Sequence, residues 1–146
     1  MPVIAMTQEM GSLGKDVALK LAEAMNLAVL RDEVVEHIAD RMHVSKSLIG
    51  RLREGKAGFV ERHTTDPRSV AVYTAEEVYT LAERGNVVIR GWGSTLLLRA
   101  VPHVVCVRVT RSFDQRVQWL GDKLGTTDTD FAADEVRRSD EAHAAR

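Results

Sequence analysis

The sequence predicts an α/β fold built on a mainly parallel sheet, and two observations carry this prediction. Short apolar runs without alternation, rich in β-branched residues, are typical of strands covered on both faces. Between them lie segments whose apolar residues recur at helical spacing. Strands and helices in alternation indicate a parallel sheet with crossover helices. The 146 residues are enough for one domain with a sizeable core.

In the first half of the chain, a glycine-containing loop joins a strand to an amphipathic helix. The strand is expected at residues 3–6 and the helix at Gly14–Met25. A second short strand is expected at residues 27–30, and Asp32 is placed to cap the helix that follows it. Within the basic stretch 41–56, apolar residues at helical intervals predict a further helix.

The second half of the chain continues the alternation after a loop, KAGFVERHTTDPRS. A helix is expected at residues 69–84, stopped by Gly85. NVVIRGWG predicts a strand and a turn, residues 94–100 a short helix, and HVVCVRVT another strand of the buried kind. Residues 112–124 form one more helix. The final helix, 127–146, has few large apolar residues, so it is not expected to pack by itself and suits a mobile lid.

The topology predicts where a ligand would bind. Ligands of open parallel sheets bind at the carboxyl ends of the strands. The loops after Met6, Arg90 and Thr110 should therefore share one edge of the sheet. This edge would bring together the first glycine loop, the Gly-Trp-Gly turn and Arg116.

The stretch EMGSLGKD partly matches the phosphate-loop pattern of Gly, four residues, Gly, Lys and Ser or Thr. Gly11 and Gly14 permit a tight turn at a helix start, where the potential is positive, and Lys15 can reach outer phosphates. Glu9 replaces the first glycine, and Asp16 replaces the hydroxyl that usually contacts magnesium. Asp16 either binds magnesium directly or repels phosphate. The simpler alternative is a strand-to-helix turn without a ligand.

Three segments together resemble the cytidylate kinase-like family of phosphate-loop kinases: VIAMTQEMGSLGKDVALKLAEAMNLAVLRDEVVEHIAD, NVVIRGWGSTLLL and HVVCVRVTRSFDQRV. In that family Glu9 and Asp16 are usual features, and a basic residue is usual at Lys15. The resemblance extends from the first strand to Arg146 and is weakest at residues 41–84. It implies that nucleotide phosphates are held by Gly11, Ser12, Leu13, Gly14, Lys15 and Asp16.

The resemblance implies a three-layer α/β fold of the nucleoside monophosphate kinase type. ATP would give its γ-phosphoryl group to a nucleoside monophosphate, with Mg²⁺ bound at Asp16. The helical region 32–84 would bind the acceptor, and 125–146 would form the lid. The family normally has a further strand and helix, so the resemblance predicts that this chain is part of a longer one. The sheet edge left incomplete could pair with a second copy in a homodimer.

Basic side chains are the expected catalytic groups, because phosphoryl transfer depends on positioning and on neutralising negative charge. The resemblance assigns catalysis to Lys15, Arg116 and Arg138, and substrate binding to Arg137 in the lid. For each arginine the alternative is a solvated helix face.

The turn after the third strand does not identify the acceptor nucleotide. The family has Gly-Arg-Asp there, whereas this chain has Gly-Trp-Gly at residues 91–93. Arg90 could substitute for the missing arginine, and Trp92 could stack on a base or pack as a buried side chain. Asp32 is the remaining candidate for substrate binding, or it is only a helix cap.

Two other classes of function compete with the kinase. One is a nucleotide-binding regulatory module with little catalysis, favoured by the uncharged turn and the missing C-terminal elements. The other is a helix-turn-helix at residues 38–56, in which Arg41, Lys46 and Arg51 would contact DNA phosphates, although His43 stands where glycine is usual.

Charge and composition argue against nucleic acid and membrane partners, and the family resemblance implies nucleotides as small-molecule partners. A net charge of −1 provides no basic field for nucleic acid or a membrane surface. Cys106 is the only cysteine, which excludes a disulfide framework and a cysteine zinc site. No apolar run approaches the roughly 20 residues that span a bilayer, and a cytoplasmic location is expected.

Overall fold

The core of the protein is a four-stranded parallel sheet. The computed structural model describes residues 1–53, 58 and 66–144. The strand order is β2-β3-β1-β4, and every neighbouring pair is parallel, as the sequence predicts. The strands are β1 (Val3–Gln8), β2 (Ala28–Leu30), β3 (Val87–Arg90) and β4 (Val104–Val109).

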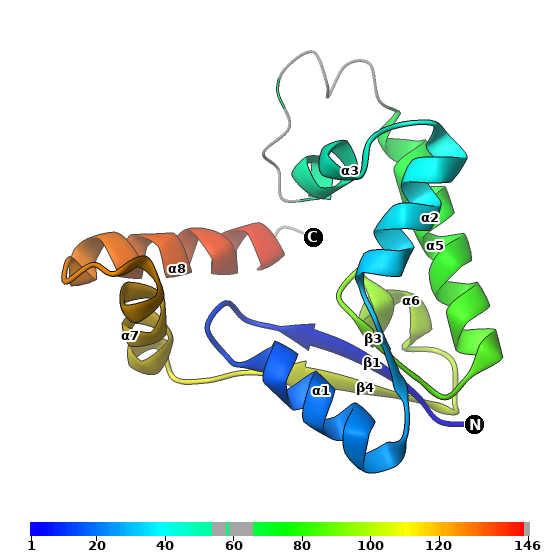
Figure 1. The fold of residues 1–146 in the computed structure, drawn as a ribbon, viewed down its shortest axis with the longest axis horizontal. Coiled ribbons are helices and arrows are strands. Elements are labelled where there is room, and N and C mark those ends of the chain that lie inside the picture. The colour runs from blue at the N-terminus through cyan, green and yellow to red at the C-terminus, as the bar shows by residue number, and fades with distance from the viewer. Residues whose placement is uncertain (54–57, 59–65, 145–146) are drawn as a thin grey trace.

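Helices cover both faces of this sheet and extend beyond one of its ends (Figure 1). They are α1 (Gly14–Met25), α2 (Asp32–Met42), α3 (Lys46–Arg53), α5 (Pro67–Arg84), α6 (Ser94–Leu98), α7 (Phe113–Leu124) and α8 (Thr129–Ala144).

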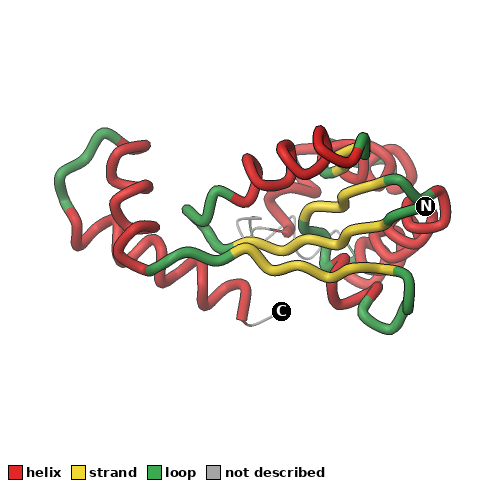
Figure 2. Tube along the Cα trace, turned by 90° about the horizontal axis from the view of Figure 1, so that it is seen from below, coloured by secondary structure: helices red, strands yellow, loops and turns green. Residues whose placement is uncertain are grey.

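Alternation along the strands produces the three layers. On β1, Val3 and Ala5 pack with α2, α5 and α6 in one core cluster, whereas Ile4 and Met6 pack with α1 in another. Because successive strand residues point to opposite faces, a continuous apolar run can serve two cores at once. Figure 2 shows α1 along one side of the strands, and the two separate clusters place α2, α5 and α6 on the opposite side. The expected three-layer α/β fold is confirmed.

The prediction of a fully buried last strand is wrong. β4 lies at the edge of the sheet, where it pairs with β1. Val105 is 58% exposed, and Cys106 and Arg108 are exposed as well. The reason is tertiary: β4 is an edge strand paired with β1, and its Val107 and Val109 are only partly buried against the cluster that contains residues of α1. β-Branched composition alone does not distinguish an edge strand from a central one.

The last helix packs better than its sequence predicts. Gly125, at φ 65°, turns the chain between α7 and α8, and the two helices cross and pack against each other at one end of the sheet (Figure 2). Ala132 and Val136 of α8 are buried against Leu120 of α7. A small residue and one β-branched residue therefore suffice as a packing face, and the expectation that this helix does not pack is wrong.

Two helix starts differ from their predictions. The structure places Arg31 at the N-cap of α2 and makes Asp32 the first helical residue, so Asp32 is not the cap. The Asp32 side chain lies outside the described residues. α5 begins at Pro67, where the Asp66 side chain accepts a hydrogen bond from the Arg68 amide at 3.0 Å. Most of the loop expected before it also lies outside the described part of the chain.

Within the described residues, none of the helices combines the length and the apolar character needed to cross a membrane.

Candidate functional site

Three loops meet at the carboxyl edge of the sheet, as the sequence predicts. The Gly91 amide donates to the Met6 carbonyl at 2.8 Å, which ties the turn after β3 to the end of β1. The Glu9 amide donates to the Val109 carbonyl at 3.1 Å and ties the first loop to the end of β4. The first loop therefore lies between the other two.

The first loop is tightly curled. Gly11 and Leu13 have positive φ angles of 78° and 63°, and the Ser12 amide donates to the Glu9 carbonyl at 3.1 Å. A left-handed leucine is strained, and such strain is concentrated at functional sites. The loop leads directly into α1 at Gly14, and the first amides of a helix have no acceptor within it. These amides and the helix dipole favour an anion at this position.

Both glycines of the loop are also required by close packing. A Cβ on Gly11 would lie 3.0 Å from the Cα of Arg116, which is in the first turn of α7. A Cβ on Gly14 would lie 2.6 Å from the Cβ of Gln8. The loop thus presses against the start of α7 on one side and against the end of β1 on the other.

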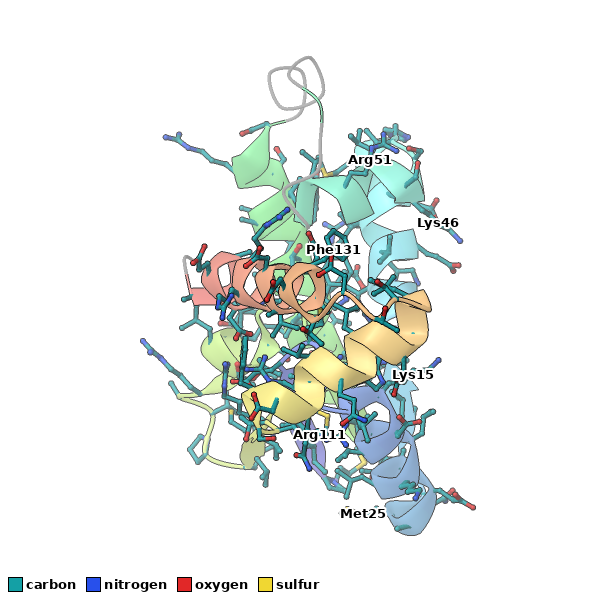
Figure 3. All side chains as sticks on the ribbon, turned by 90° about the vertical axis from the view of Figure 1, so that its left-hand side faces the viewer. Lys15, Met25, Lys46, Arg51, Arg111 and Phe131 are labelled. Carbon is teal, nitrogen blue, oxygen red and sulfur yellow. The ribbon has the colours of Figure 1, made fainter. Side chains whose placement is uncertain are left out.

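The polar side chains at the loop differ in burial: Ser12 is buried, whereas Lys15 and Asp16 are exposed. The Ser12 hydroxyl is buried and has no hydrogen-bond partner in the described structure. A buried polar group without a partner is costly and calls for an explanation, which a bound anion would provide. Lys15 and Asp16 are exposed in the first turn of α1. In Figure 3, Lys15 lies at the end of α1 nearer to α7 and α8, with Met25 at the far end.

The carboxylate of Glu9 is neutralised by two arginines. Its Oε1 lies 3.3 Å from Arg108 on β4, and its Oε2 lies 3.4 Å from the Nε of Arg116. The side chain is 19% exposed. The unusual acid at this position therefore holds two cations beside the loop, and its own charge is compensated there.

Arg116 is the most deeply buried cation that the structure describes at this edge. Its side chain is only 7% exposed, so the alternative of a solvated helix face is wrong. Nη1 and Nη2 donate to the two carboxylate oxygens of Asp140 on α8 at 2.9 and 3.1 Å. Nε donates to the Arg111 carbonyl at 3.2 Å. The hydrogen bonds to Asp140, opposed by burial, raise the pKa of Arg116 above its ordinary value.

The lid arginines are on the surface. Arg137 pairs with Asp134 at 3.0 Å and lies 5.2 Å from the centroid of the Phe113 ring, and Arg138 pairs with Glu135 at 3.0 Å. Their side chains are 59% and 69% exposed. The structure therefore brings Arg116, but not Arg138, into contact with the loop.

The turn after β3 has a buried tryptophan. Gly91, Trp92 and Gly93 all have positive φ angles, and Trp92 is 5% exposed within the core cluster of α2, α5 and α6. Of the two alternatives for Trp92, the structure supports packing over stacking on a base. Arg90 is also buried and donates from Nη2 to the Gln8 Oε1 at 3.2 Å.

The region expected to resemble a helix-turn-helix does contain two joined helices, with His43 in the left-handed conformation between α2 and α3. Two of its described basic side chains, Arg41 and Lys46, form ion pairs within the protein. Lys46 pairs with Glu36, and Arg41 pairs with Glu76 and lies 4.4 Å from the Tyr73 ring centroid. In these two pairs an acidic side chain of the protein occupies the cation that DNA phosphates would need.

Sequence reasoning missed three residues of the site. Arg108 is an arginine in an otherwise apolar strand, which was a usable signal. Gln8 ends β1 directly before the loop. Asp140 is 24 residues from its partner Arg116, and no sequence pattern marks that pair.

A glycine loop that opens a helix at the carboxyl edge of a parallel sheet defines the class of phosphate-loop α/β proteins. Within that class, the chain belongs to the cytidylate kinase-like family, whose model matches residues 3–146. The expected family is confirmed.

Solved structures with low sequence identity share the fold. A crystal structure of an uncharacterized protein from Eubacterium ventriosum matches at 20% identity and a TM-score of 0.67, over 97% of this chain and 72% of that one. Shikimate kinase from Bacteroides thetaiotaomicron matches at 18% identity and 0.62, over 99% and 79%. A gluconokinase from Sinorhizobium meliloti matches at 16% and 0.59, over 97% and 74%. Among curated protein sequences, none matches this chain.

Proposed function

We propose that the protein transfers the γ-phosphoryl group of ATP to a nucleoside monophosphate. The single observation that carries the proposal is the tightly curled loop at the start of α1, with the buried, unpartnered hydroxyl of Ser12. Phosphate oxygens would accept from this hydroxyl and from the first amides of α1. Membership of the cytidylate kinase-like family supports phosphoryl transfer as the reaction class.

The residues at the loop fit a magnesium–nucleotide complex. Magnesium is usually held by one or two carboxylates together with the phosphates of its substrate and water. The described residues contain no cluster of three acidic, histidine or cysteine ligands, so Asp16 would act as a single carboxylate ligand. When bound, the ion neutralises negative charge on the phosphates.

The basic residues are assigned by their distance from the loop. Lys15, at the helix start, would contact the outer phosphates, and Arg116 would stabilise charge on the transferred group. Arg137 and Arg138 would reach the phosphates only after α8 changes its position. Residues 32–84 remain the proposed acceptor region, with Arg90 beside the loop as a substrate-binding candidate.

The second candidate function is a nucleotide-binding regulatory module with little catalysis. Two observations favour it. The turn at residues 91–93 has no charged side chain, and Arg116 is paired with a carboxylate of its own chain. A panel of nucleoside monophosphates supplied with ATP and Mg²⁺ separates the two functions, because only a kinase produces ADP in response to an acceptor.

The direct test of the nucleotide site is Lys15→Ala, with Lys20→Ala on the exposed face of the same helix as control. At ATP concentrations 100-fold above Kd, binding should stabilise the folded protein by about 2.7 kcal/mol, or roughly 8 °C in Tm. Lys15→Ala should lose most of this shift in a thermal unfolding assay, and Lys20→Ala should keep it. An equal shift in all three proteins would remove Lys15 from the site.

A further inference from the structure

Arg116 is paired with an anion of its own chain, the carboxylate of Asp140. The Nε side and the Nη side of the guanidinium have different partners. Its Nε side is anchored by the Arg111 carbonyl at 3.2 Å and by Glu9 at 3.4 Å. Its Nη side carries the bidentate pair with Asp140, at 2.9 and 3.1 Å. The first side is held by the segment just before α7 and by the first loop, whereas the second connects α7 to α8.

A phosphate group would bind to the same side as Asp140. Planar guanidinium groups bind carboxylates and phosphates with the same two parallel hydrogen bonds. The Arg116 side chain is 7% exposed and that of Asp140 is 37% exposed, so the carboxylate is the partner that can leave toward solvent. The guanidinium lies beside the phosphate loop, because its Nε is 3.4 Å from Oε2 of Glu9, a residue of that loop.

The position of Glu9 keeps Arg116 in place during such an exchange. Glu9 bridges Arg116 and Arg108, and it belongs to the loop itself. When Asp140 leaves, the guanidinium keeps its Nε contacts with Arg111 and Glu9, and its two Nη donors are available to a phosphate group. A buried guanidinium without an anion on that side would be costly, which explains why the chain supplies one.

We propose that Asp140 is a positioning residue that stands in for a ligand phosphate on Arg116 and that a bound polyphosphate displaces it. This inference rests on the proposed function, since it requires a phosphate at the loop. Displacement separates α8 from Arg116, so occupancy of the loop is coupled to the position of the helix that carries Arg137 and Arg138. The cost of displacement lowers the apparent affinity of the ligand-free protein for phosphate.

The experiment measures the Kd of inorganic tripolyphosphate by titration calorimetry at one fixed salt concentration. Asp140→Asn keeps the shape of the side chain and removes its charge, and Glu141→Gln removes one charge from the neighbouring exposed position as control. Asp140→Asn should bind at least about threefold more tightly than the wild type, because less of the site is blocked. Glu141→Gln should bind like the wild type. Thermal unfolding of each variant verifies that it is folded.

A double-mutant cycle ties the effect to Arg116. Arg116→Ala should bind more weakly than the wild type, and adding Asp140→Asn to it should not restore affinity. If Asp140→Asn binds with equal or lower affinity than a wild type that does bind, Asp140 is only a structural partner and the inference is overturned while the nucleotide site stands. If neither the wild type nor Asp140→Asn binds tripolyphosphate, the proposed function fails and the inference fails with it. Tighter binding by Glu141→Gln as well would show a general charge effect and would also overturn the inference.

Discussion

Gly11 should tolerate no side chain, and the structure provides two separate reasons. Its φ of 78° costs a non-glycine residue about 1–2 kcal/mol. A Cβ would in addition lie 3.0 Å from the Arg116 Cα and 3.1 Å from its carbonyl oxygen, both backbone atoms that cannot rotate away. Overpacking of this kind costs about 1–3 kcal/mol. Gly11→Ala should therefore destabilise the fold by about 2–5 kcal/mol.

Gly125→Ala is the matched control for this substitution. Gly125 has a similar φ of 65°, but a Cβ there would meet no atom within 4 Å. Gly125→Ala should cost only the conformational term of about 1–2 kcal/mol. Both free energies are measured by urea unfolding, and the difference between them reports the contact between the loop and α7. Equal losses in the two variants would refute the reasoning that this contact is tight.

The remaining predictions concern Trp92 and Glu36. In a Trp119→Phe variant, Trp92 is the only tryptophan. Because it is 5% exposed, its fluorescence emission should be blue-shifted, resistant to quenching by acrylamide and unchanged by nucleoside monophosphates. A change in emission on adding a nucleotide would instead support stacking of Trp92 on the base. The hydrogen bond from Lys46 lowers the pKa of Glu36 below its ordinary 4.5. Its stabilising contribution is therefore complete above the ordinary pKa and is lost as pH falls through the lowered one. The difference in Tm between the wild type and Glu36→Gln should shrink in acid, and a constant difference would contradict this assignment.

The parallel sheet and the glycine loop could be predicted because their signals are local. The apolar run at the start of the chain identified β1, and helical periodicity identified α1 and α5. Even the shared edge followed from topology, since parallel strands end on the same side. The exposure of β4 could not be predicted, because it depends on which helix covers which strand. For the same reason, the small packing face of α8 was missed.

The candidate site divides in a similar way. Gly11, Gly14 and Lys15 are contiguous in sequence, so their chemistry could be inferred directly from the loop pattern. The partners of Arg116 could not be inferred, because Glu9 lies far before it in the sequence and Asp140 lies well after it. The sequence left two roles open for Trp92, stacking on a base or packing in the core, and its burial supports packing.

The sequence by itself determined the fold class, the family resemblance and the loop that would hold phosphates, because each depends on residues close together in the chain. Only the tertiary structure decided how charge is distributed around that loop. The negative charge of Glu9 is compensated by Arg108 and Arg116, and Asp140 binds the Nη side of Arg116. Electrostatic interactions depend on separation in space and on burial, and neither is encoded in the spacing of residues along the chain.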